Sequence, residues 1–105
     1  IGLCDCLDII SYFGAFSAAP TTNPATVISE KLNDFSDYGI SFFYNICGTE
    51  DAIAFASASA AVSKLTDLTD KLTEGKNFIW QKVSGGHDFD IWYLGFYNFI
   101  NIIFR

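Results

Sequence analysis

Ile40-Ser41-Phe42-Phe43-Tyr44-Asn45-Ile46-Cys47, the most strand-like stretch of this 105-residue chain, is nearly continuously apolar. Such a run is typical of a strand in a sheet that is covered on both of its faces. The turn-forming residues Gly48-Thr49-Glu50-Asp51 follow it directly. We therefore expect a buried strand over residues 40–47 that ends in a loop.

Shorter strand and helix signals precede this strand. Ile10–Phe16 is apolar and aromatic, which predicts a short buried strand leading into a loop over residues 17–24. Pro24 is well suited to a helix start, so we expect a short helix over Ala25–Asn33. The first residues, Ile1–Cys4, are interpreted as the middle of an element that begins earlier.

The residues after Asp51 predict a long helix, a third strand and a last helix. Apolar residues recur at spacings of three and four before Gly75, a natural helix stop. Phe78–Val83 is expected to form a strand, and Asp90 is a candidate N-cap of the last helix. The two apolar stripes consist of Ala54, Ala58, Ala61, Leu65, Leu68 and Leu72, and of Trp92, Phe96, Phe99 and Ile103.

This alternation of strands and helices predicts an α/β fold, a parallel sheet of about three strands with three to four helices on its faces. Ligands of such sheets bind beyond the C-terminal ends of the strands. Asp51 comes just after the strand that ends at Cys47, and His87 comes just after the strand that ends at Val83. We expect these two side chains to be able to meet in space.

The composition is that of a globular protein and limits its partners. Half of the residues are apolar, 17% are charged, and the net charge is −6. Because no basic stripe is available to neutralise phosphates, nucleic-acid binding is not expected. The apolar run Phe89–Phe104 contains Asp90, Asn98 and Asn101, which indicates a core helix and not a membrane span.

The cysteines Cys4, Cys6 and Cys47 predict neither a disulfide framework nor a metal site. Their number is odd, and no second Cys/His pair stands at zinc-ligand spacing. We expect buried or partly buried thiols and no metal or other cofactor. Cys47 as a nucleophile is a minor alternative, since no elbow motif surrounds it.

Asp51 followed by His87 matches the last two members of a Ser…Asp…His triad. In such a triad the imidazole takes the serine proton, and the carboxylate holds the imidazole in the required tautomer. The order Ser…Asp…His belongs to α/β-hydrolases. The serine itself is absent, because no Gly-x-Ser-x-Gly occurs in the chain. A solitary histidine without this context is more often a surface or structural residue.

Three segments in order resemble the putative-esterase family of α/β-hydrolases, which includes bacterial feruloyl (cinnamoyl) esterases. The first resembles the stretch after the nucleophile elbow, the second the segment with the catalytic acid, and the third the C-terminal histidine signature. They are Ile1-Gly2-Leu3 with Leu7-Asp8 and Tyr12–Pro20; Cys47-Gly48-Thr49-Glu50-Asp51; and Gly85-Gly86-His87-Asp88-Phe89 with Trp92, Gly95, Asn98 and Phe99.

The resemblance implies that residues 1–105 are the C-terminal portion of a single α/β-hydrolase domain. His87 would then be the general base and later the general acid, and Asp51 would be the orienting carboxylate. The nucleophilic serine would lie about ten residues before Ile1. Glu50 is the weaker candidate for the acid, because the family pattern places the acid on the last residue of the Gly-Thr-x-Asp run.

Three further residues near this site have alternative interpretations. Asp88 is expected to fix the loop through a local hydrogen bond. Trp92 is a candidate for the acyl-binding pocket, although packing of the last helix against the sheet is the more ordinary role. Ser17 is interpreted as a solvated loop serine, with a hydroxyl near the active site as the alternative.

The function that the resemblance implies is that of a serine carboxylic-ester hydrolase, similar to feruloyl or acetyl xylan esterases. Its substrate would be a plant cell-wall carbohydrate ester, and the protein would be secreted by a bacterium, with attachment to glycoside hydrolase or binding domains a further option. Acyltransferase or thioester hydrolase chemistry on the same fold is one alternative. A non-catalytic carbohydrate-binding or structural domain is the other, because aromatic residues make up 17% of the chain.

Residues 1–105 alone are expected to hydrolyse nothing, since they lack the nucleophile. They are also expected to associate or to be poorly soluble, because the first strand would offer an open edge.

Overall fold

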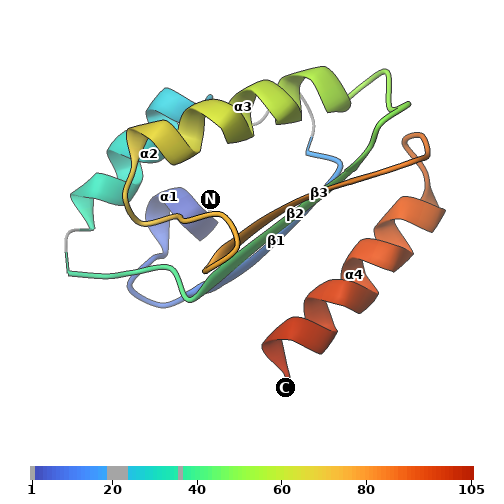
Figure 1. Cartoon of the computed structure of the whole chain (residues 1–105). Coiled ribbons are helices and arrows are strands. Elements are labelled where there is room, and N and C mark those ends of the chain that lie inside the picture. The colour runs from blue at the N-terminus through green and yellow to red at the C-terminus, as the bar shows by residue number, and fades with distance from the viewer. Residues whose placement is uncertain (1, 19–23, 36) are drawn as a thin grey trace.

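The computed structural model describes residues 2–18, 24–35 and 37–105. Within these residues, three parallel strands form one sheet in the order β1-β2-β3 (Figure 1). The predicted α/β class with a parallel sheet is confirmed. The elements are α1 (Gly2–Asp5), β1 (Tyr12–Phe16), α2 (Ala25–Asp34), β2 (Phe42–Gly48), α3 (Phe55–Leu68), β3 (Phe78–Val83) and α4 (Phe89–Ile103).

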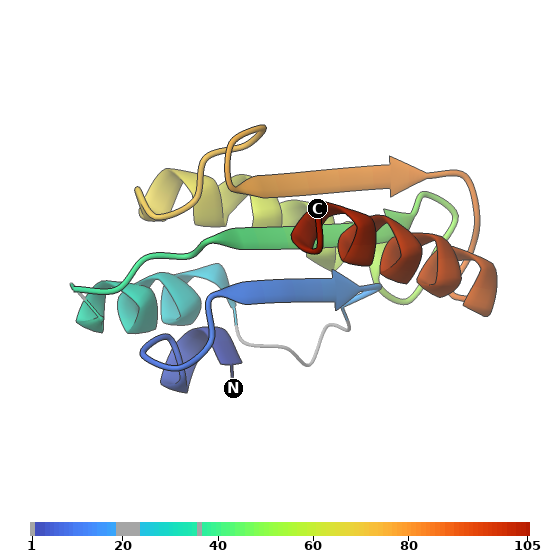
Figure 2. The same ribbon diagram turned by 90° about the horizontal axis from the view of Figure 1, so that it is seen from below.

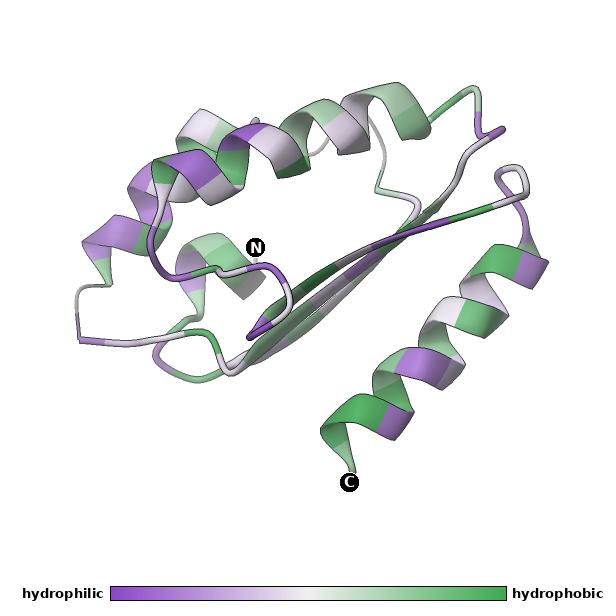
Figure 3. Ribbon diagram, in the orientation of Figure 1, coloured by the Kyte–Doolittle hydropathy of each residue, from purple (hydrophilic) through white to green (hydrophobic). Residues whose placement is uncertain are grey.

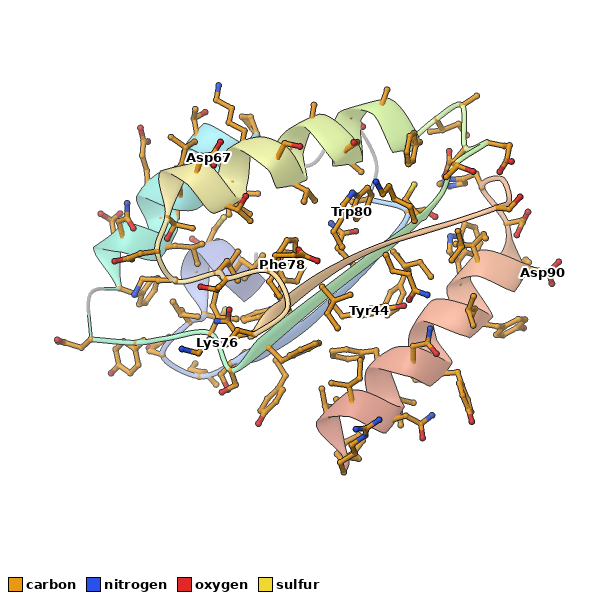
Figure 4. The ribbon with its side chains drawn as sticks, in the orientation of Figure 1. Tyr44, Asp67, Lys76, Phe78, Trp80 and Asp90 are labelled. Carbon is orange, nitrogen blue, oxygen red and sulfur yellow. The ribbon has the colours of Figure 1, made fainter. Side chains whose placement is uncertain are left out.

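The sheet is the middle of three layers, with α1, α2 and α3 on one face and α4 on the other (Figures 1 and 2). Successive residues of β2 point to opposite layers. Phe43 belongs to the apolar cluster under α2 and α3, whereas Tyr44 and Ile46 belong to the cluster under α4. Figure 4 shows Tyr44 on the α4 side and Phe78 on the other. The continuous apolar run of β2 therefore reflects burial on both faces, as predicted.

Helix α4 packs on the sheet through a glycine. A Cβ at Gly95 would lie 2.5 Å from Cγ2 of Ile46 and 2.7 Å from Cδ1 of Phe16, so only glycine permits this approach. Ile91 and Gly95 are the buried residues of the helix. The face of α4 that meets the sheet is therefore turned relative to the predicted apolar stripe. Phe96, a member of that stripe, is 55% exposed.

Helix α3 ends earlier than predicted. Thr69 already has an extended backbone, so Leu72 is not on the helix, although it is buried at 3% exposure. The Asn77 side chain holds the segment that follows: its amide donates to the Lys71 carbonyl at 2.7 Å. Gly75, at φ 81, lies in the turn before β3 and does not end the helix.

The N-cap of α4 is Asp88 and not Asp90. Asp88 Oδ1 accepts a hydrogen bond from the backbone N–H of Ile91 at 3.3 Å, and Asp90 lies in the first helical turn. This is the local hydrogen bond that was expected of Asp88. Strands β1 and β2 each begin two residues later than predicted, and residues 19–23 of the predicted loop lie outside the described residues.

A cluster of polar side chains also joins α4 to strands β2 and β3. Tyr44 donates a hydrogen bond to Oε1 of Gln81, and the Asn98 amide lies 3.1 Å from the same oxygen. These groups line a hollow of about 690 Å³ between α4 and strands β2 and β3. The hydrogen bonds satisfy polar atoms that would otherwise be costly to bury.

Candidate active site

The two predicted site residues lie together just beyond the C-terminal ends of adjacent strands. Asp51 follows β2, and His87 follows β3, which pairs with β2 in parallel. Nδ1 of His87 lies 2.8 Å from Oδ2 of Asp51, within hydrogen-bond distance. The parallel sheet therefore brings together an imidazole and a carboxylate that are 36 residues apart.

Asp51 is held by hydrogen bonds on both carboxylate oxygens. Its side chain has no exposed surface. Oδ1 accepts from the backbone N–H groups of Ile53 at 2.9 Å and Ala54 at 2.8 Å. Burial raises the pKa of the Asp51 carboxyl, but the hydrogen bonds from Ala54, His87 and Ile53 outweigh it, and the net pKa lies below its ordinary value. Asp51 is therefore an oriented carboxylate at neutral pH.

The loop that carries His87 rests directly on the end of β2. The Thr49 N–H donates to the Val83 carbonyl at 2.8 Å, and the Glu50 N–H donates to the Gly85 carbonyl at 2.9 Å. A Cβ at Gly48 would lie 2.2 Å from the Gly85 carbonyl oxygen. These contacts continue the pairing of β2 with β3 beyond the strands and set the position of His87.

Glu50 binds this loop instead of the imidazole. Its carboxylate accepts hydrogen bonds from the Gly85 N–H and from the Ser84 hydroxyl. The Gly85 N–H, followed by the Thr49 hydroxyl, lowers the pKa of the exposed Glu50 carboxyl. From the sequence alone, Glu50 is only the weaker candidate for the acid, and its contact with the loop is not predicted. Two sequence features could have indicated the contact between Glu50 and this loop: Glu50 adjoins the acid, and two consecutive glycines, Gly85 and Gly86, precede His87.

Trp92 lies in the first turn of α4, between the sheet and His87. Its indole packs against the cluster that contains Ile46 and Ile91, as expected of a residue that joins the last helix to the sheet. The indole and the imidazole also meet edge to face, with ring centroids 5.1 Å apart and planes at 86°. Trp92 Nε1 donates to the Ser17 hydroxyl at 3.0 Å.

Ser17 is buried at 5% exposure, so its interpretation as a solvated loop serine is wrong. Its hydrogen-bond partner, Trp92, is 75 residues away in the sequence. The position of Ser17 directly after the predicted strand was the available sequence signal that its hydroxyl lies near the site.

Cys47 is buried behind the acid. Its thiol has no exposed surface and lies 3.7 Å from Oδ2 of Asp51. Burial, followed by the neighbouring negative charge of Asp51, raises the pKa of this thiol. A protonated, enclosed thiol that donates to a carboxylate gives no support to Cys47 as a nucleophile.

The arrangement can hold one imidazole as a base. Because the Asp51 carboxylate accepts a hydrogen bond from the Nδ1–H group of His87, Nε2 is the nitrogen with a free lone pair. The side chain of His87 is 31% exposed, in contrast to that of Asp51. No hydroxyl among the described residues hydrogen-bonds this imidazole.

The described residues were found to hold neither a metal-ligand group nor a membrane-spanning helix. They contain no group of three or more His, Cys, Asp or Glu side chains that could hold a metal ion. In the same ranges, no helix has the length and apolar character needed to cross a membrane.

The fold and the site thus define an α/β protein with an aspartate–histidine pair at the C-terminal edge of its parallel sheet. No family model matches the chain, and no solved structure gives a significant match to it.

Proposed function

We propose that this chain provides the acid and the base of a serine carboxylic-ester hydrolase. The observation that carries the proposal is the 2.8 Å contact between Nδ1 of His87 and the buried, multiply hydrogen-bonded carboxylate of Asp51. A carboxylate in this position fixes the tautomer and stabilises the imidazolium that forms during acyl transfer. The resemblance of three ordered segments to the putative-esterase family supports the same assignment.

The proposed reaction passes through an acyl-serine. As the serine oxygen attacks the ester carbonyl carbon, its proton passes to Nε2 of His87. The tetrahedral intermediate collapses when His87 returns this proton to the departing alcohol. Water then attacks the acyl-serine with His87 again as base, which releases the carboxylic acid and restores the serine.

We further propose that the sheet is part of an α/β-hydrolase fold and continues beyond β1. Within the described residues β1 is an edge strand; its first residue, Tyr12, is 49% exposed, and Ile9 shortly before it is 82% exposed. A strand paired with this edge and followed by the nucleophile would bring a serine to the side of the sheet where His87 lies.

The proposed substrate is a carbohydrate ester of the plant cell wall, with a feruloyl or acetyl group. This part of the proposal rests on the family resemblance and includes secretion from a bacterium. Transfer of the acyl group to another alcohol, or hydrolysis of a thioester, would use the same two residues.

The test uses the full-length protein with p-nitrophenyl acetate and methyl ferulate as substrates. We expect the His87→Ala variant to lose about 10³-fold or more in kcat, as triad variants do. A fluorophosphonate probe should label one serine of the parent protein, and His87→Ala should label much more slowly. Loss of less than about tenfold in the variant, or a parent that neither hydrolyses esters nor reacts with the probe, would contradict the proposal.

One observation favours a second candidate, a carbohydrate-binding domain. Hydrophobic residues predominate along α4 (Figure 3), and Phe89, Tyr93 and Tyr97 on it are 65%, 70% and 67% exposed. Exposed rings can stack on sugars, although Phe89 and Tyr93 here stack on each other at 5.9 Å. Retention of the parent protein on insoluble xylan, lost in Tyr93→Ala but kept in His87→Ala, would support this candidate.

A further inference from the structure

We propose that Ser17 and Trp92 form a positioning pair that sets the orientation of the His87 imidazole. This inference rests on the proposed function and concerns two residues that do not take part in proton transfer themselves.

The backbone of Ser17 has an uncommon conformation at the end of β1. Its φ of 54° makes it the sole non-glycine residue in the described ranges with a positive φ. Such a conformation is unfavourable for a residue with a Cβ and persists where surrounding contacts impose it. One such contact is the hydrogen bond from the Ser17 N–H to the Ile46 carbonyl at 2.9 Å, which ties Ser17 to β2.

The hydroxyl of Ser17 links both halves of the site. It accepts from Nε1 of Trp92 at 3.0 Å, and the Trp92 ring contacts His87. Burial raises the pKa of the Cys47 thiol, and the nearby Ser17 hydroxyl opposes this rise. The same thiol contacts Oδ2 of Asp51 at 3.7 Å. The buried Ser17 side chain is therefore bonded to Trp92, which contacts the base, and lies near Cys47, which contacts the acid.

Trp92 restrains the imidazole at a point that Asp51 does not reach. A hydrogen bond through Nδ1 alone allows the ring to swing about that contact. The indole, packed edge to face against the imidazole at 5.1 Å, limits this motion. Phe89 packs on the indole at 5.0 Å, and the hydrogen bond from Nε1 fixes its remaining edge. Correct placement of Nε2 thus depends on Ser17 through Trp92.

A different role for Ser17, that of nucleophile, is not supported. Its hydroxyl accepts a hydrogen bond from Trp92, and no hydrogen bond joins it to His87 within the described ranges.

The test separates the hydroxyl from the backbone conformation. Ser17→Gly removes the hydroxyl but relieves the positive φ. Because the loss of the hydrogen bond from Trp92 and the relief of backbone strain oppose each other, the thermal midpoint should stay within a few degrees of that of the parent protein. We expect its kcat for p-nitrophenyl acetate to fall about 10- to 100-fold with KM within about threefold, because small misplacements of a base have effects of this size. A purely structural role would leave kcat unchanged in this variant.

Trp92→Phe keeps a ring but loses the N–H donor, so we expect a similar loss in kcat. The Ser17→Gly/Trp92→Phe double variant should lose no more than either single variant, since both changes remove the same hydrogen bond. Trp80→Phe is the matched control, because Trp80 lies on the opposite face of the sheet (Figure 4), where it stacks on Phe55. The kcat of this variant should stay within about twofold of that of the parent protein.

Nuclear magnetic resonance provides a readout that does not depend on catalysis. In Ser17→Gly the His87 ring resonances should shift and the Trp92 indole proton should exchange at least tenfold faster, while the Trp80 indole is unchanged. Unchanged resonances with parental kcat would overturn the positioning role. A parent that hydrolyses no ester, with the resonance changes present, would instead contradict the proposed function. A fluorophosphonate adduct mapped to Ser17 would overturn the inference and assign Ser17 as the nucleophile.

Discussion

Gly48 lies so close to Gly85 that a Cβ added at position 48 would come within 2.2 Å of the Gly85 carbonyl oxygen. The end of β2 and the loop that carries His87 therefore touch through their backbones. Because backbone atoms cannot rotate away as a side chain can, the contact sets how near His87 lies to Asp51.

Gly48→Ala should consequently disturb both stability and the site. We expect the free energy of unfolding to fall by about 1–3 kcal/mol, the usual cost of overpacking a buried position. The kcat for the proposed ester hydrolysis should fall as well, since the loop must move. Urea unfolding and steady-state kinetics measure the two effects. Gly39→Ala is the control, because a Cβ at Gly39 meets nothing within 4 Å; equal effects of the two substitutions would contradict this account.

The lowered pKa of Asp51 predicts a loss of stability in acid. The unfolded chain binds a proton at the ordinary aspartate pKa of about 3.9, whereas the folded protein binds it only at lower pH. The stabilising contribution of Asp51 is therefore complete above about pH 4 and disappears as pH falls through the folded pKa. Asp51→Asn should be less stable at neutral pH and should lose less of its remaining stability between about pH 4 and pH 2.

Urea titrations of the parent and the variant at several pH values check this prediction. Glu50→Gln is a useful comparison, since the pKa of Glu50 is also lowered and part of the acid slope comes from it. Parallel stability curves for the parent and Asp51→Asn would show that the carboxylate of Asp51 does not contribute.

Much of the fold was predictable because its signals are local. The run from Ile40 to Cys47 is apolar at successive positions, and that pattern by itself requires cover on both faces. The end of α3 was not predictable in this way. Leu72 continues the apolar stripe, but the chain leaves the helix at Thr69, and hydrogen bonds from Asn77 hold the segment that follows. The spacing of apolar residues predicts that Leu72 is buried, but it does not predict whether a helix or a loop carries that residue.

The candidate site was predictable in part for a similar reason. Asp51 and His87 each follow a strand, and parallel strands end at one edge, so their meeting follows from topology. The role of Ser17 depends on its hydrogen bond with Trp92, which is 75 residues away, and no local sequence pattern predicts a hydrogen bond over that separation. Which face of α4 meets the sheet depends on Gly95. That role cannot be predicted from the sequence, because it follows from the close approach of Gly95 to Ile46 in the folded protein.

Cys47 should be chemically inert in the folded protein. It has no exposed surface, and both burial and the charge of Asp51 raise the pKa of its thiol, which lowers the thiolate fraction that reacts with alkylating agents. Iodoacetamide at pH 8 should label the half-buried Cys6 first. Cys47 should react only after unfolding in urea. Peptide mapping by mass spectrometry measures both rates, and faster native labelling of Cys47 than of Cys6 would contradict the buried, protonated thiol.

The adjacent carboxylates Asp51 and Glu50 should respond differently to the same chemical change. In Asp51→Asn the amide cannot replace a carboxylate that both fixes the tautomer and stabilises the imidazolium, so kcat should fall about 10³- to 10⁴-fold. In Glu50→Gln the amide oxygen can still accept from the Gly85 N–H, so kcat should stay within about tenfold of the parent. Both substitutions remove one negative charge at neighbouring positions, which makes each the control for the other. A larger loss in Glu50→Gln would mean that the loop contact matters more than the contact to His87, and that Asp51 is not the orienting acid.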